Sequence, residues 1–199
     1  MNTDRRKSIA HVAMSILRRI DGVDSACLHG SLSGPTADRY SDIDIKVEFP
    51  ADDARSASRK VQDAMQTSLG VEFMDWAPSL LPDTPVMTYS IVGLSIFWNI
   101  DVEISVPART RNVTADMVRN NPIGHLLKLW SVTLKHRIRN DQRSAGEIEK
   151  VWGRTVGTGA VPADGYLALR GALDVMAASM QFPSFIAQCH EELKEVEGT

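Results

Sequence analysis

A short segment in which charged and apolar residues alternate constrains this chain more than any other feature. The run Asp42-Ile43-Asp44-Ile45-Lys46-Val47 has the period of two that is typical of a β-strand with one buried face. Its apolar residues share the buried face, and both aspartates point to the other face, about 7 Å apart at their α-carbons. The sequence therefore predicts a sheet that displays two carboxylates side by side.

A Gly-Ser pair lies upstream of this strand. Gly30-Ser31 follows the partly apolar run 23–28, which predicts another strand, and residues 31–41 form a loop rich in Ser, Gly, Pro, Thr and Asp. A glycine lets the backbone approach a phosphate closely, and a serine hydroxyl and amide can donate to phosphate oxygens. Paired carboxylates bind the divalent ions that neutralise phosphates. The combination indicates phosphoryl-type transfer.

The remaining patterns divide the chain into a mixed half and a helical half. The first half adds a helix at 7–19, a helix at 54–69, a strand at 71–74 and a hairpin at 86–106 that turns near Gly93. After Pro107 only helical patterns remain: one capped by Thr114, then 122–139, 144–155, 164–180 and 183–197. We expect an α/β (α+β) domain over 1–108, with a mixed sheet and flanking helices, and an all-helical bundle over 109–199.

Composition excludes several classes of function. A formal net charge of -3 argues against broad electrostatic attachment to nucleic acid, which makes a nucleic-acid partner unexpected. Cys27 and Cys189 stand far apart without a CxxC or Cys/His cluster, so neither a disulfide framework nor a zinc site is predicted. The sequence has no run of 18 apolar residues and no signal-peptide pattern. We expect a cytoplasmic protein with no membrane span.

The segment GSLSGPTADRYSDIDI resembles the motif of the DNA polymerase β-like nucleotidyltransferase superfamily, and within it that of the antibiotic nucleotidyltransferases of the kanamycin or aminoglycoside type. The resemblance implies that Asp42 and Asp44 hold two Mg²⁺ ions, and that Gly30, Ser31 and Ser41 bind the nucleotide. Many relatives carry Arg-Gly where this chain has Gly34-Pro35. Arg39 and Lys46 are candidate substitutes for that arginine.

The superfamily's third carboxylate usually lies on a later strand. The setting of Asp101, in Trp98-Asn99-Ile100-Asp101-Val102, resembles that of the kanamycin-type enzymes, and the resemblance makes Asp101 our candidate for both catalysis and metal binding. Glu103 would face the same side and could serve instead. Glu72 is a weaker rival, and Asp75 is weaker still.

The helical half carries one further candidate. His125-Leu126-Leu127-Lys128-Leu129-Trp130 resembles a Leu-Leu-Lys-x-Trp helix of template-independent nucleotidyltransferases, in which the lysine meets the triphosphate. Lys128 is therefore a candidate nucleotide ligand, although a lysine on an amphipathic helix is more often solvated. His29, Trp98 and Trp130 are expected to be structural.

Together these features predict transfer of an NMP group from an NTP, with ATP as the expected donor, to a hydroxyl of a small-molecule acceptor, with release of pyrophosphate. The resemblance further implies an aminoglycoside-like acceptor, a helical domain that closes the cleft, and a homodimer. Two alternatives stay open: an antitoxin-type enzyme that transfers AMP to a protein, and a nucleotide-binding sensor without catalysis.

Overall fold

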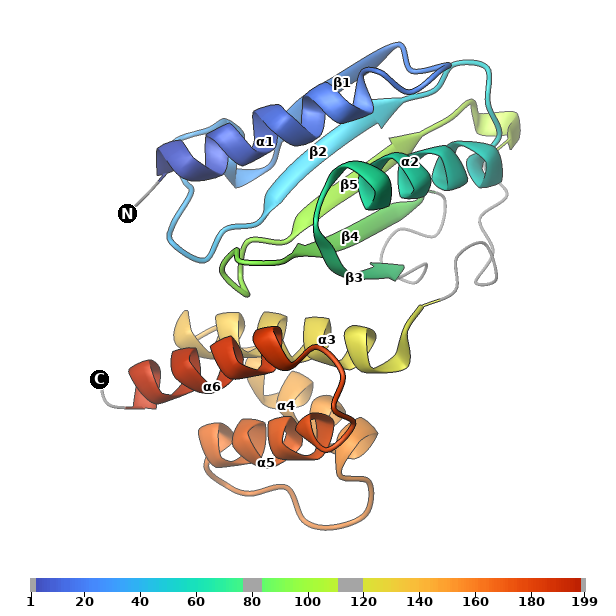
Figure 1. The fold of residues 1–199 in the computed structure, drawn as a ribbon. Coiled ribbons are helices and arrows are strands. Elements are labelled where there is room, and N and C mark those ends of the chain that lie inside the picture. Colours follow the sequence, from blue (N-terminus) through green and yellow to red (C-terminus); the bar gives the residue numbers. More distant parts are fainter. Residues whose placement is uncertain (1–2, 77–83, 111–119, 198–199) are drawn as a thin grey trace. The chain divides into compact units, whose positions relative to one another are not determined.

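The computed structural model describes residues 3–76, 84–110 and 120–197 (Figure 1). The chain divides into two compact units, one of residues 1–94 and 98–120 and the other of residues 95–97 and 121–199. The helix predicted to begin at Thr114 lies outside the described residues, and the predicted domain boundary at residue 108 stays a prediction. No helix within the described ranges has the length and apolar character needed to cross a membrane.

The first unit is built on a five-stranded sheet with the order β1-β2-β5-β4-β3. Strands β2 and β5 run parallel, and every other neighbouring pair is antiparallel, which confirms the predicted mixed sheet. The strands are β1 (Ser25–His29), β2 (Ile43–Glu48), β3 (Val71–Trp76), β4 (Val86–Ile91) and β5 (Ile100–Ser105). The last strand in the sequence thus occupies the middle of the sheet.

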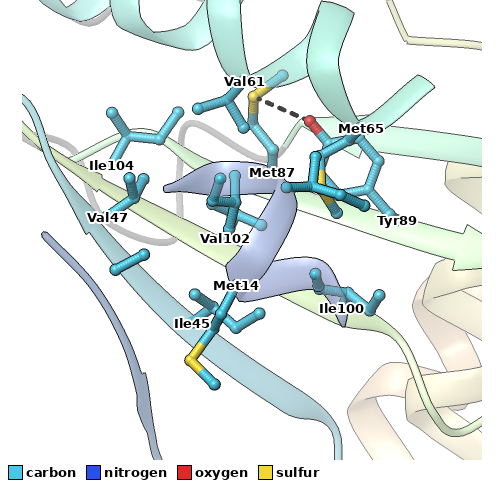
Figure 2. Close-up of a cluster of buried hydrophobic side chains, with 14 of the residues drawn as sticks. Met14, Ile45, Val47, Val61, Met65, Met87, Tyr89, Ile100, Val102 and Ile104 are labelled. Atoms are coloured by element: carbon cyan, nitrogen blue, oxygen red, sulfur yellow. Dashed lines mark hydrogen bonds between the residues drawn. The ribbon is translucent and has the colours of Figure 1, made fainter. Parts of the chain in front are cut away.

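Helices α1 (Thr3–Leu17) and α2 (Ala54–Ser68) contribute to one apolar core together with alternate residues of the strands. Figure 2 shows Met14 of α1 and Val61 of α2 in this core beside the buried Ile45 of β2 and Val102 of β5. Strands β2 and β5 each have one buried face, as expected for an alternating sequence. In β2 the odd-numbered residues are fully buried, and the residues between them are half-buried. The two helices therefore pack on the apolar face of the sheet and not on its polar face.

The second unit is a helical bundle, as predicted. It comprises α3 (Pro122–Ile138), α4 (Ser144–Thr155), α5 (Gly165–Ala177) and α6 (Pro183–Glu197). Trp130 of α3 is fully buried and donates its indole N–H to the carbonyl of Leu169 on α5, 2.7 Å away. An indole that is buried and hydrogen-bonded in this way has a packing role, as we expected from the sequence.

Candidate active site

The register of the sheet aligns one polar residue from each strand in a single row. In the order of the strands, the row is His29, Asp44, Asp101, Thr88 and Asp75. Residues that pair directly across neighbouring strands lie on the same face of a sheet, roughly 4.8 Å apart in the hydrogen-bonding direction. Asp44 and Asp101, which are distant in the sequence, are therefore neighbours on the polar face, and Asp42 precedes Asp44 on that face.

Gly30 lies directly against the Asp44 carboxylate. It follows β1 with φ of 64° and ψ of -158°, a conformation that side chains rarely adopt. A Cβ atom built on Gly30 would lie 2.1 Å from Oδ2 of Asp44 and 2.8 Å from its Cγ. Only a glycine leaves room for the carboxylate here. The structure thus links the two halves of the sequence motif, the Gly-Ser turn and the aspartate strand, through one contact.

The turn that follows Gly30 is a short 3₁₀ helix, Ser31–Ser33, anchored by the buried side chain of Leu32. The hydroxyl of Ser33 donates to the carbonyl of Gly30 (2.7 Å), and the amide of Gly34 donates to the carbonyl of Ser31 (3.2 Å). These bonds fix the backbone beside Asp44. Ser31 is half-buried at the start of this turn.

Ser41 has a structural contact in addition to the nucleotide-binding role predicted for it. Its hydroxyl donates to Oδ1 of Asp38 (2.9 Å) and accepts from the Asp38 amide (3.0 Å), and the same Oδ1 accepts from the amide of Tyr40 (2.9 Å). This network closes the loop immediately before Asp42. The nucleotide-binding role of Ser41 stays a prediction.

Asp101 is oriented by its neighbour on β4. The hydroxyl of Thr88, which is almost fully buried, donates to Oδ1 of Asp101 at 2.5 Å. Since β4 and β2 flank β5 on opposite sides, this oxygen is held on the side away from Asp44. One oxygen of Asp101 is thus fixed by a protein donor.

We expect Thr88→Val to lower metal-dependent turnover by roughly 10- to 100-fold, the usual cost of losing a hydrogen bond that orients a metal ligand. Valine keeps the shape of the buried side chain but removes the donor to Asp101. The measurement is pyrophosphate release at saturating NTP and Mg²⁺. Thr133→Val is a matched control, because Thr133 is equally buried and its hydroxyl donates within its own helix, to the carbonyl of Leu129 at 2.8 Å. Equal turnover in both variants would contradict an orienting role for Thr88.

The rivals of Asp101 occupy different places in the sheet. Glu103 lies two residues further along β5, paired in register with Lys46. Glu72 lies on β3 where the register shifts between Val71 and Phe73. Asp75 is fully buried at the β3 end of the polar row, a position that its place in the sequence did not reveal. The choice of Asp101 as the third carboxylate stays a prediction.

Two basic residues are candidate substitutes for the arginine missing from the loop. The amine of Lys46 is 3.4 Å from a carboxylate oxygen of Glu48, on the same strand. The guanidinium of Arg39 lies 4.8 Å from the centre of the Tyr40 ring. A third basic residue, Arg6 of α1, was not predicted from the sequence, and it is fully buried. Its spacing from Ala10, Ala13 and Leu17 on the buried face of α1 is the signal that could have revealed it.

The residues present suit a magnesium ion that is shared with a nucleotide. Mg²⁺ is usually held by one or two carboxylates together with substrate phosphates, and not by a cage made only of protein groups. Asp42 and Asp44 supply two half-buried carboxylates on one face, and the missing side chain of Gly30 leaves space beside the second. Within the described ranges, no three His, Cys, Asp or Glu side chains are grouped as a metal site. Phosphate oxygens would complete the ligand set.

Lys128 belongs to the helical unit, on α3. It is half-buried, and its carbonyl accepts a hydrogen bond from the hydroxyl of Ser131 at 2.9 Å. Its contact with a triphosphate stays a prediction.

Comparison with known proteins gives one family match. Residues 13–86 match the family model of the nucleotidyltransferase domain. The match includes Gly30, Ser31, Ser41, Asp42 and Asp44 and ends before Asp101. It is to the domain in general and does not single out the kanamycin-type enzymes. No curated protein sequence matches the chain.

Solved structures to which the chain is similar include that of Cid1, an RNA terminal uridylyl transferase, with 14% identity and a TM-score of 0.43 over 77% of this chain and 41% of Cid1. The GLD-2/RNP-8 complex has 15% identity and a TM-score of 0.42, over 86% of this chain and 76% of the other. A cytoplasmic RNA terminal U-transferase has 13% identity and a TM-score of 0.39, over 84% and 45%. The chain thus spans less than half the length of Cid1, and at such values none of these proteins bears on its substrate.

The family match and the geometry agree on the same residues. The turn at Gly30 and the carboxylates of Asp42 and Asp44, which the sheet brings together, all lie within the matched segment. Residues 13–86 are therefore similar to a nucleotidyltransferase domain, and the similarity includes the turn and both carboxylates.

Proposed function

We propose that this protein transfers an NMP group from an NTP, with ATP as the expected donor, to a hydroxyl of a small-molecule acceptor. The observation that carries the proposal is the contact of Gly30 with Asp44, in register with Asp101 on the neighbouring strand. A backbone turn that admits a phosphate, beside carboxylates that bind divalent ions, is what nucleotidyl transfer needs.

In this proposal each residue has a separate task. Asp42 and Asp44 would hold two Mg²⁺ ions, and the chemistry that bound Mg²⁺ would supply is neutralisation of the phosphate charge. The turn at Gly30 and Ser31 binds the β- and γ-phosphates through its amides and the serine hydroxyl. Asp101 would complete the metal site and accepts the proton of the acceptor hydroxyl. The acceptor oxygen then bonds to the α-phosphorus while the bond to the pyrophosphate oxygen breaks.

The charges on the polar face support a small cationic acceptor. Glu48 and Glu103 continue the acidic character of this face beyond Asp44 and Asp101, and Lys46 between them is already 3.4 Å from Glu48. Such a surface disfavours an RNA acceptor, whose negative charge no bound metal would neutralise along its length, and it attracts a polyamine. An aminoglycoside or a similar amino-sugar antibiotic has both the positive charge and the free hydroxyls that the reaction requires, so antibiotic resistance is the proposed role.

The test is a screen of the four NTPs against three classes of acceptor, with pyrophosphate release as the readout. The acceptors are aminoglycosides, RNA oligonucleotides with a free 3′-hydroxyl, and candidate partner proteins. We expect release that needs both ATP and an aminoglycoside-like compound. Release with RNA alone would overturn the small-molecule acceptor, and label transferred to protein would favour the antitoxin-type alternative. If the chain bound NTP with Mg²⁺ but released no pyrophosphate with any acceptor, the result would favour the nucleotide-binding sensor.

A further inference from the structure

Helix α1 buries a charged residue against the loop that leads into β2. Arg6 has no exposed surface, and its Nη1 donates to the carbonyl of Asp38 at 2.5 Å and to the carbonyl of Ser41 at 3.0 Å. Ser41 directly precedes Asp42. A single guanidinium nitrogen therefore ties both ends of the Asp38–Ser41 turn to the helix.

The same arginine also contacts the segment that leads into β5. Its guanidinium carbon lies 5.4 Å from the centre of the Trp98 ring, within the range of a cation–π interaction. The indole N–H of Trp98 donates to the carbonyl of Arg39, 3.0 Å away, in the same turn. We call Arg6, Trp98 and the carbonyl groups of Asp38, Arg39 and Ser41 the Arg6–Trp98 clamp.

The Arg6–Trp98 clamp thus lies where both strands that carry the candidate acids begin. Strand β2 begins one residue after Asp42, and β5 begins two residues after Trp98. The segments that lead into β2 and β5 are also joined directly, since the amide of Ile43 donates to the carbonyl of Asn99 at 2.9 Å. Any movement of the clamp would shift Asp42 relative to Asp101.

Stability alone does not account for an arginine at this position. Burial lowers the pKa of Arg6, and the nearby charges of Asp38 and Asp42 act in the opposite direction. Among the described residues, Nε and Nη2 of Arg6 find no hydrogen-bond partner. A buried charge with part of its hydrogen-bonding capacity unused has a free-energy cost, because it is removed from water without full compensation.

We propose that Arg6 and Trp98 are positioning residues that set the place of Asp42 relative to Asp101 and so tune the affinity of the site for divalent metal. This inference rests on the proposed function, because it assumes that these acids bind metal. Both residues act through the hydrogen bonds that they donate to the Asp38–Ser41 turn, and Arg6 also acts through its charge near Asp42.

The test is a titration of the whole 199-residue chain with Mn²⁺ alone, in which electron paramagnetic resonance measures the free ion and no acceptor is needed. We expect Arg6→Lys to weaken Mn²⁺ binding about tenfold, the lower end of the usual loss when a group that orients a metal ligand is removed. Lysine keeps the charge but lacks the planar guanidinium that stacks on Trp98. Arg18→Lys is the matched control, since Arg18 also donates to a backbone carbonyl, that of Ala26 at 2.6 Å, on β1. Its Mn²⁺ affinity should equal that of the wild type.

Trp98→Phe provides a second, independent variant. It keeps an aromatic ring for Arg6 and loses the donor to the carbonyl of Arg39, so we expect a smaller loss of affinity, about threefold. Circular dichroism shows whether each variant folds. If Arg6→Lys does not fold, the Mn²⁺ affinity of Trp98→Phe tests the positioning role. Wild-type affinity in the folded variants would overturn the positioning role. Absence of Mn²⁺ binding in the wild type, or its persistence in Asp42→Asn, would instead overturn the proposed function and the positioning role with it.

Discussion

Asp44→Asn is expected to lower metal-dependent transfer by at least about 10³-fold while the sheet remains folded. A catalytic metal contributes several kcal/mol of transition-state stabilisation, and about 1.4 kcal/mol corresponds to a factor of ten in rate. Asparagine has the shape of aspartate but no charge, so it weakens metal binding without opening a cavity beside Gly30. Asp42→Asn should behave in the same way, because both carboxylates lie on the polar face next to the Gly-Ser turn.

The measurement is pyrophosphate release as a function of Mg²⁺ concentration, with the acceptor identified by the screen. Asp63→Asn is the matched control: this exposed aspartate lies on α2, which packs on the opposite face of the sheet. Thermal unfolding followed by circular dichroism should give similar midpoints for all three variants. Unchanged turnover in either Asp42→Asn or Asp44→Asn would contradict the assignment of these residues as metal ligands.

Gly30→Ala is expected to abolish activity nearly as completely, for a steric reason. The added methyl group would lie 2.1 Å from Oδ2, 2.8 Å from Cγ and 3.1 Å from Cβ of Asp44. Rotation of the carboxylate cannot relieve contacts with all three atoms, so either Asp44 or the turn must move. The backbone conformation adds a cost of about 1–3 kcal/mol, because alanine rarely adopts a positive φ with this ψ.

A matched glycine separates these two causes. Gly93 also has a positive φ, 76°, but a Cβ atom there would meet nothing within 4 Å. Gly93→Ala should therefore lose only about 1 kcal/mol of unfolding free energy, measured by urea denaturation, and keep its Mn²⁺ affinity. Gly30→Ala should lose both stability and affinity. If Gly30→Ala bound Mn²⁺ as tightly as Gly93→Ala, its contact with Asp44 would have no role in the site.

The sequence predicted those features that depend on local chemistry. Strict alternation placed Ile45 in the core and Asp44 on the opposite face, and the fold confirms both. The same reasoning anticipated the mixed sheet and the helical bundle, because hydrophobic periodicity follows directly from the geometry of strands and helices. The sequence predicted a close approach of the Gly30 backbone to a phosphate, but it did not predict the contact of Gly30 with the Asp44 side chain.

Features that depend on strand pairing between distant segments could not be predicted in this way. The pairing of Asp44 with Asp101 and the hydrogen bond from Thr88 depend on the register of β2, β5 and β4, which no local pattern specifies. Arg6 was missed because the predicted helix began at residue 7, whereas α1 begins at Thr3. An arginine near a helix start is normally assumed to be solvated, and only the tertiary structure reveals that it is buried.

The order of the strands also affects how the chain folds during its synthesis. Because β5 enters the sheet between β2 and β4, a growing chain that has reached residue 99 holds two separate pairs of strands, β1 with β2 and β3 with β4. Each pair then exposes an unsatisfied edge, which is prone to association with other chains. Emergence of β5 closes both edges and brings Asp101 beside Asp44 in one event. Incomplete chains therefore carry the full Gly-Ser and aspartate motif but lack the assembled row of acids, so assembly of the candidate site coincides with the pairing of the inner edges of β2 and β4.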